Sequence, residues 1–292
     1  MNIKKEEAKK IAVLRAGGLG DLIVTFPAIK AIKCAYPEAE IVLIAERMHN
    51  GLLERGRSAV DRVVVPPFSW HLPEEAGRSS EEIDAFFRAM QEEKFDIAVH
   101  FQGKGIAANQ VIKKFKARVT AGNTCEGAVP PDHSLPFYYY QNEITRCLEV
   151  AGLIGARTVN LNPQINLLEE DRQEAREVLR QYRIKKPYIL LHPGAMDIRR
   201  MWPAEKFASL GNVLAGRGYT IVITGAKEDH PAVSAVLSEM PPGAVSLYNC
   251  LSLGGLGALA AESALTVSND TGPLHLARAV GAKTVGLYWA PN

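Results

Sequence analysis

Short apolar runs alternate along the chain with segments of helical period. The runs at 11–14 and 188–191 are continuously apolar, and 220–224 is apolar between two threonines, which is typical of strands buried on both faces of a parallel sheet. Between such runs, apolar residues recur at three- and four-residue spacing, for example over 80–93 and 169–183. Because strand–helix alternation covers a parallel sheet with helices on both faces, the pattern predicts an α/β fold.

The alternation pauses once and then starts again. It stops near 161–164, which reads LNPQ, and the next apolar strand is 188–191. We therefore expect two Rossmann-like domains, residues 1–162 and 163–292, each with its own sheet. Proline places loops at 66–67 and over 127–136.

The first glycine-rich turn, residues 15–22, reads RAGGLGDL and lies between strand 11–14 and an expected helix over 23–36. A dinucleotide fingerprint would need a third glycine where Ile23 stands, and no Gly-Lys-Ser/Thr of a P-loop follows. What remains is a turn that sets one carboxylate, Asp21, at the carboxyl end of a strand, where open α/β sheets bind ligands. Asp21 is thus a candidate general base, and capping of the following helix is the alternative.

A second turn lies near the end of the chain, where residues 268–277 read SNDTGPLHLA between a strand and a helix. A capping residue, a glycine that allows close approach and a proline at the first helical position are typical of a helix start. Its free N–H groups and positive dipole suit an anion such as a diphosphate, although an ordinary capped helix fits too. The residues expected to face the anion are Asp270, Thr271, Gly272, Pro273 and His275.

Composition narrows the class of protein. A chain of 292 residues with 47% hydrophobic residues can fill two cores, and a net charge of +2 argues against a dedicated nucleic-acid binder. The four cysteines have neither disulfide nor zinc spacing, so no metal site is expected. No apolar run approaches the ~20 residues of a membrane span, and the first ten residues lack the apolar core of a signal peptide. These features predict a cytoplasmic protein with reduced thiols.

Three blocks, in this order, carry a family resemblance: LRAGGLGDLIVTFPAIKAIKCAYPEAEIVLIAE, LLHPGAMDIRRMWPAEKFASLGNVLAGRGYTIVITGAKED and SLGGLGALAAESALTVSNDTGPLHLARAVGAKTVGLYWAPN. Together they span about two fifths of the chain, and they resemble glycosyltransferase family 9, the heptosyltransferases. The resemblance implies a GT-B fold, in which two Rossmann-like domains face each other across a cleft. It further implies an inverting, metal-independent transfer from a nucleotide-diphosphate sugar, with ADP-heptose as the donor and a lipopolysaccharide core or a related surface glycan as the acceptor.

The resemblance also assigns residues to the donor. The turn after strand 188–191 would place the backbone of Gly194 and Ala195 against the diphosphate. Arg200 stands two positions before Trp-Pro, where the family usually has a lysine, and would stabilise the leaving diphosphate; a surface arginine pair is the alternative. Leu251 matches the backbone position that meets the adenine, or else belongs to the core. Glu228, after strand 220–224, is a candidate for the ribose or an exposed loop acid, with Asp229 second.

Within the first domain, the remaining candidates are less specific. Gly18 and Gly20 of the first turn are expected to approach the donor, and Gln102 and Lys104, after strand 95–100, the acceptor. In this scheme Asp21 takes the proton of the acceptor hydroxyl. The basic segment 111–118 could contact an anionic glycolipid or the inner membrane surface, or form a solvated helix face.

One departure and two alternatives remain open. The resemblance implies a further stretch beyond Asn292, so the second domain is expected to be incomplete at its carboxyl end. A nucleotide-sugar epimerase of the same architecture would bind the same donor and need no acceptor. A non-catalytic module would bind the donor without turnover.

Overall fold

The structure is a computed structural model that describes residues 7–46, 52–53, 56–68, 79–240 and 242–288. The second domain is expected to be incomplete at its carboxyl end, and the final residues 289–292 lie outside the described residues. The chain divides into two compact units, Met1–Gln164 and Ile165–Asn292. Each unit has its own parallel sheet with helices on both faces, so the predicted α/β fold is confirmed.

The sheet of the first unit has six parallel strands in the order β3-β2-β1-β4-β5-β6. The chain runs outward from β1 to one edge, then returns to the other side of β1, which is the Rossmann order. Its strands are β1 (Lys10–Leu14), β2 (Glu40–Ile44), β3 (Arg62–Val64), β4 (Ile97–His100), β5 (Val119–Thr124) and β6 (His133–Pro136). Its helices are α1 (Leu19–Ile23), α2 (Phe26–Ala35), α3 (Ser80–Glu92), α4 (Ile106–Lys114) and α5 (Glu143–Leu153).

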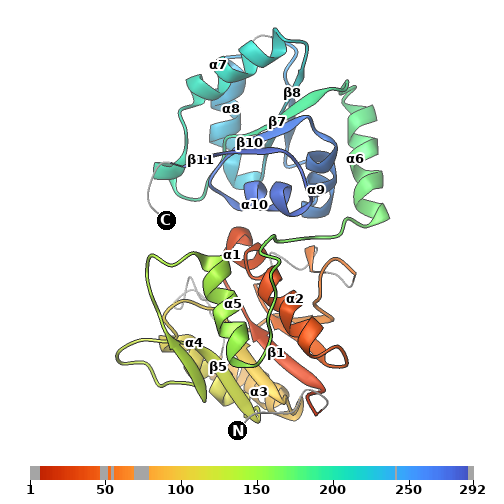
Figure 1. The fold of residues 1–292 in the computed structure, drawn as a ribbon. Helices are drawn as coiled ribbons and strands as arrows, with labels where there is room; N and C mark the ends of the chain where they lie inside the picture. The colour runs from red at the N-terminus through yellow and green to blue at the C-terminus, as the bar shows by residue number, and fades with distance from the viewer. Residues whose placement is uncertain (1–6, 47–51, 54–55, 69–78, 241, 289–292) are drawn as a thin grey trace. The chain divides into compact units, whose positions relative to one another are not determined.

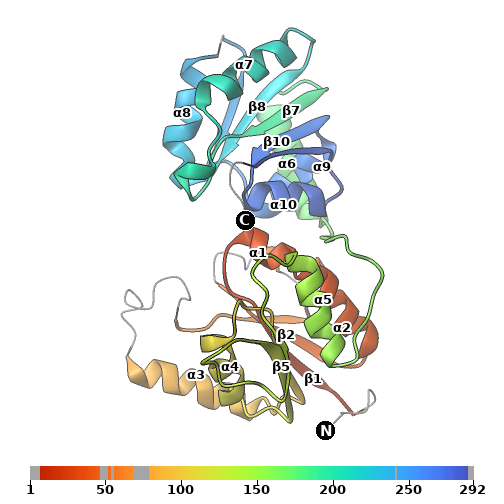
Figure 2. The same cartoon turned by 60° about the vertical axis from the view of Figure 1, so that its left-hand side comes forward.

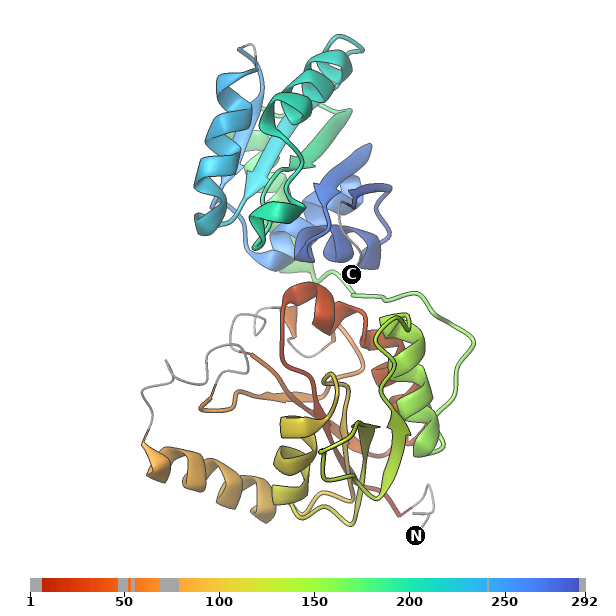
Figure 3. The same ribbon diagram turned by 90° about the vertical axis from the view of Figure 1, so that its left-hand side faces the viewer.

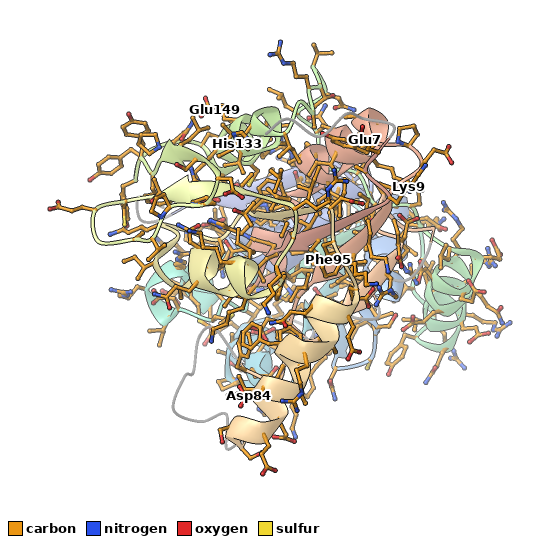
Figure 4. The ribbon with its side chains drawn as sticks, turned by 90° about the horizontal axis from the view of Figure 1, so that it is seen from below. Glu7, Lys9, Asp84, Phe95, His133 and Glu149 are labelled. Atoms are coloured by element: carbon orange, nitrogen blue, oxygen red, sulfur yellow. The ribbon has the colours of Figure 1, made fainter. Side chains whose placement is uncertain are left out.

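Helices α3 and α4 cover one face of this sheet, and α2 packs beside α5 (Figures 1 and 2). Helices α3 and α4 pack around an aromatic cluster in which Phe115 contacts Phe86, Phe87 and Phe95. Phe95 is labelled in Figure 4, near one end of α3. Burial of these rings, with the apolar faces of β1, β2 and β4, forms the core beneath α3 and α4.

The sheet of the second unit has five parallel strands in the order β11-β10-β7-β8-β9. One face packs against α6, α9 and α10 and the other against α7 and α8, as Figure 3 allows the reader to follow. The strands are β7 (Tyr188–His192), β8 (Thr220–Gly225), β9 (Val245–Tyr248), β10 (Leu265–Asn269) and β11 (Thr284–Leu287). The helices are α6 (Glu169–Gln181), α7 (Ala204–Ala215), α8 (His230–Ser238), α9 (Leu253–Glu262) and α10 (Gly272–Ala279).

Two sequence predictions were wrong in detail. The single helix expected over 23–36 is two helices, because the Thr25 hydroxyl donates to the Leu22 carbonyl at 2.6 Å and a new helix begins at Phe26 with Pro27 in its first turn. The loop expected over 127–136 ends in strand β6. Asp132, which accepts from the N–H and the hydroxyl of Thr120 at 2.8 Å, aligns that strand beside β5, and the terminal proline is tolerated at an edge.

The basic segment 111–118 lies on the end of α4 and the residues that follow it. Ile112 and Phe115 are fully buried, while Lys113, Lys114 and Lys116 are exposed. The apolar residues of the segment therefore belong to the core, which favours the solvated helix face over a membrane contact. Within the described part of the chain, no helix is both long and apolar enough to span a bilayer.

Candidate functional site at the carboxyl edges of the two sheets

In the second unit, the ends of β7 and β10 are neighbours in the sheet, and both lead into the turns singled out from sequence. Asn269, the last residue of β10, is fully buried and ties three segments together. Its Nδ2 donates to the Pro193 carbonyl at 2.7 Å, and its Oδ1 accepts from the Trp202 N–H at 3.0 Å. These two bonds therefore fix the turn after β7 and the segment before α7 relative to the start of α10.

Asp270 follows directly and faces two cationic or ionisable groups. Its Oδ2 lies 3.6 Å from the Arg200 guanidinium, and its Oδ1 lies 3.6 Å from Nε2 of His275. The Asp270 side chain is 9% exposed, whereas the Arg200 side chain is 43% exposed and His275 29%. The carboxylate is therefore buried beneath two groups that still reach solvent, where an anion could meet them.

Thr271 is the N-cap residue of α10, with Pro273 in the first turn, as the sequence predicts. The Thr271 backbone is extended, with φ −154° and ψ 169°, and its side chain makes no capping hydrogen bond. The N–H groups of the first turn have no acceptor within the helix, and they point toward a ligand anion together with the positive end of the helix dipole. The structure thus brings Arg200, Asp270, His275 and this helix start together.

The two arginines before Trp202 have different partners. Arg199 is 84% exposed and pairs with Asp197 at 2.7 Å, and this contact holds the pKa of Asp197 at about 2. Arg200 instead turns toward Asp270. Trp202 packs its ring against Phe207 with centroids 5.2 Å apart, which agrees with a packing role.

The turn after β7 is packed from below by Asp229. A Cβ placed on Gly194 would lie 2.0 Å from Oδ1 of Asp229, so only glycine fits there. Oδ2 of the same carboxylate accepts from the Ala226 N–H at 2.8 Å and lies 3.7 Å from Nε2 of His192. His192 is buried at the end of β7, and burial lowers its pKa. Asp229, the second choice for the ribose, is therefore occupied in supporting the turn.

Two predicted donor residues lie apart from these contacts. Glu228 is exposed in the short helix 227–229 after β8. Leu251 follows β9 at the edge of the sheet and packs partly against the core formed with α6 and α9. Neither observation tests their roles, and both remain predictions.

In the first unit, the turn after β1 is built around Asp21, which lies in the first turn of α1 rather than before a helix start. Its Oδ2 accepts from the Gly18 N–H at 3.0 Å, so the carboxylate does cap its own turn. A Cβ on Gly17, whose φ is +113°, would lie 2.8 Å from that oxygen. The Asp21 side chain is nevertheless 50% exposed, and a capping role does not exclude proton transfer. Gly20 lies inside α1.

Arg15 is the residue here that sequence reasoning missed. Its guanidinium is 4% exposed and donates to Oδ1 of Asp21 and to the Asp21 carbonyl, each at 3.0 Å. It also donates to the Phe101 carbonyl at the end of β4. A charged residue between a buried strand and two glycines was the available signal, because such a side chain needs a partner within the turn.

Gln102 and Lys104 follow β4. Oε1 of Gln102 accepts from the Ala16 N–H at 3.1 Å and joins the turns after β1 and β4. Lys104 is exposed. The structure therefore gives Gln102 a structural contact beside the Asp21 turn and leaves Lys104 at the surface; their acceptor roles stay predictions.

His100, the last residue of β4, is fully buried beside the Gln102 turn. Its Nδ1 accepts from the Gln102 N–H at 3.1 Å, so Nε2 carries the proton and donates to Oδ1 of Asn109 at 2.6 Å. Burial lowers the pKa of His100 to about 4. A Cβ on Gly122 would lie 2.0 Å from its Nε2, so the neighbouring strand is shaped around the ring.

This histidine predicts a pH dependence of stability. Because its pKa is depressed in the folded state, its stabilising effect is complete above about pH 6.5 and is lost as the pH falls toward 4. The loss should amount to about 3 kcal/mol. Urea unfolding at pH 7 and pH 5 should show a larger fall in free energy for the wild type than for His100→Gln. An equal fall in both proteins would contradict this.

Asn269 provides a second stability prediction. Asn269→Ala removes the partners of the Trp202 N–H and the Pro193 carbonyl, each costing about 1–3 kcal/mol when left unpaired. Urea unfolding should show this loss, and Asn212→Ala, at an exposed position in α7, serves as the control. Equal stability of the two variants would mean that water or a neighbour replaces the amide.

Among the described residues, no group of three His, Cys, Asp or Glu side chains is arranged to hold a metal ion. What the two edges offer instead is a helix start beside a cation in the second unit and a fixed, half-exposed carboxylate in the first. Helix starts at the carboxyl ends of parallel strands are typical positions for phosphate binding in α/β proteins.

Comparison with known proteins agrees with this class. Residues 83–292 match the model of glycosyltransferase family 9 (heptosyltransferase). Lipopolysaccharide heptosyltransferase 3 of Escherichia coli is 22% identical over 94% of this chain and 81% of its own length. The chain therefore belongs to glycosyltransferase family 9 and is a glycosyltransferase.

Solved structures share the fold. A family 9 glycosyl transferase from Veillonella parvula DSM 2008 superposes with a TM-score of 0.82 at 20% identity, covering 99% of this chain and 85% of the other. The E. coli ADP-heptose lps heptosyltransferase II superposes at 0.77 with 21% identity, covering 96% and 84%. At these identities the likeness establishes the fold, and it confirms the predicted GT-B class of two Rossmann-like units with parallel sheets.

Proposed function

We propose that this glycosyltransferase moves a heptose from ADP-heptose to a lipopolysaccharide-core acceptor, with inversion at the anomeric carbon and without a metal ion. Membership of the heptosyltransferase family and likeness to a protein named for ADP-heptose support the donor. The observation that carries the proposal is the group of Arg200, Asp270 and His275 at the start of α10. Asn269 links this helix start to the turn that contains Gly194.

In the proposed reaction the second unit holds the donor. The diphosphate lies against the backbone of Gly194 and Ala195 and the Thr271–Gly272–Pro273 helix start, with His275 and Arg200 beside it. As the bond between the anomeric carbon and the phosphate oxygen breaks, negative charge grows on the leaving ADP. Preorganised N–H groups and a guanidinium stabilise that charge without a divalent ion.

The first unit supplies the proton acceptor. A hydroxyl of the acceptor attacks the anomeric carbon from the face opposite the diphosphate, so the configuration inverts. Asp21 takes the hydroxyl proton as the new carbon–oxygen bond forms, a contribution typically worth ~10²–10⁴ in rate. Gln102 and Lys104, from the same sheet edge, are proposed on the acceptor side, and Glu228 and Leu251 on the ribose and adenine. An acceptor of this kind would place the enzyme at the inner face of the cytoplasmic membrane.

Calorimetric titration tests the donor part of the proposal. ADP should bind in the presence of EDTA, with UDP, GDP and NAD weaker, and added magnesium should not be required. His275→Ala should bind ADP more weakly than wild type. Preference for another nucleotide, or strict dependence on magnesium, would overturn the proposed donor or the metal-free mechanism.

A further inference from the structure

The Asp21 turn contains the buried guanidinium of Arg15, which is held in place by several hydrogen bonds. Arg15 follows β1, and its N–H still donates to the Ile44 carbonyl at 3.1 Å, so its backbone belongs to the sheet. Its side chain is 4% exposed, and all three nitrogens donate: Nε and one terminal nitrogen to Asp21, the other to the Phe101 carbonyl. A lysine could not reproduce these three bonds, because its donors all lie on one nitrogen rather than on the three nitrogens of a planar guanidinium.

Asp21 is consequently fixed through both carboxylate oxygens. Oδ1 accepts from Arg15 and Oδ2 from the Gly18 N–H, each at 3.0 Å. Two such bonds leave other lone pairs of the carboxylate unused, and half of the side chain faces solvent. The carboxylate can therefore receive a proton from outside while its direction is held from inside.

Arg15 itself is supported by helix α5. Oε2 of Glu143, in the first turn of that helix, lies 3.6 Å from the Arg15 guanidinium. Oε1 of Glu143 pairs with Arg146, which is also 4% exposed and lies with its guanidinium 4.5 Å from the centre of the Phe137 ring. Two buried guanidinium groups thus share Glu143, and Arg15 has Asp21 as its second anion. Desolvated cations of this kind need such partners.

We infer that Arg15 is a positioning residue for the transfer reaction: it holds the Asp21 carboxylate in the direction that receives the acceptor proton, with Glu143 supporting Arg15. The inference rests on the proposed role of Asp21 as the base. A displacement of about 1 Å in a catalytic group can cost about 10² in rate. Loss of Arg15 should therefore lower kcat while leaving the donor contacts of the second unit intact.

The test is a kinetic double-mutant cycle on the full chain, with ADP-heptose and a heptose-deficient lipid A-core acceptor. Arg15→Gln should lower kcat about 10²-fold, Arg15→Lys about 10-fold, and Glu143→Gln by a few-fold. The dissociation constant of ADP should change less than twofold in each. Arg176→Gln is the control, because Arg176 is 55% exposed and pairs with Glu169 on α6, outside the candidate residues.

A merely structural arginine gives a different pattern in the cycle. If Arg15 acts through Asp21, the Arg15→Gln/Asp21→Asn double variant should turn over as slowly as Asp21→Asn alone. Rates that multiply, or wild-type kcat in Arg15→Gln, would overturn the inference and leave the proposed function standing. Wild-type kcat in Asp21→Asn would remove Asp21 as the base and the inference with it. If Arg15→Gln does not fold, Arg15→Lys and its double variant give the same comparison.

Discussion

Asp21→Asn should lower kcat by ~10²–10⁴ and leave ADP affinity unchanged. The amide cannot take the acceptor proton, and Asp21 belongs to the first unit, whereas the contacts proposed for the ADP diphosphate belong to the second. The measurement is a steady-state transfer assay combined with calorimetric titration of ADP.

The amide also has a local cost that the assay must separate from chemistry. Its NH₂ group must face either Arg15 or the Gly18 N–H, and both are donors to the native carboxylate. Circular dichroism and thermal unfolding should therefore accompany the kinetics. Asp84→Asn is the control, since Asp84 is exposed on α3 and is labelled in Figure 4. Joint loss of ADP binding and turnover would indicate that Asp21 is structural instead.

Gly194→Ala should weaken ADP binding by at least about 10-fold and destabilise the second unit by about 1–3 kcal/mol, the usual cost of overpacking. The added Cβ would lie 2.0 Å from Oδ1 of Asp229. That carboxylate has little room to move, because its other oxygen bonds the Ala226 N–H and lies beside His192. The turn must shift instead, and with it the backbone proposed to meet the diphosphate.

A matched glycine is available on α5. A Cβ on Gly152 meets nothing within 4 Å, so Gly152→Ala should bind ADP as wild type does and unfold no more easily. In an Asp229→Ala background, Gly194→Ala should cost less stability than in the wild type, because the clashing carboxylate is gone. Equal affinity and stability of Gly194→Ala and Gly152→Ala would contradict the steric account.

Much of the fold was predictable because local pattern and tertiary structure agree. Continuous apolar runs such as β7 are buried on both faces, as the sequence implies. Strand β6 was missed because a proline-rich stretch carries no strand signal. It forms through a contact between Asp132 and Thr120, which pattern does not reveal. The break between α1 and α2 was missed because apolar residues continue through it.

The site was predictable where glycine, proline and a strand end mark a turn. That reasoning located the Asp21 and Asp270 turns, but not the side chains that hold them in place. Arg15 and Asn269 act through contacts with residues distant in the chain, at the Phe101 and Pro193 carbonyls. Such contacts depend on which strands become neighbours, and the order of strands in a sheet cannot be predicted from any single motif.

The central claim is transfer of heptose from ADP-heptose, and a single reaction tests it most directly. Purified protein, ADP-heptose and a lipid A-core acceptor lacking heptose would be incubated with EDTA, and both products followed by mass spectrometry. The account predicts one heptose added to the acceptor for each ADP released, with no conversion when the acceptor is omitted. Intact donor and acceptor, or consumption of ADP-heptose without any acceptor, would contradict it.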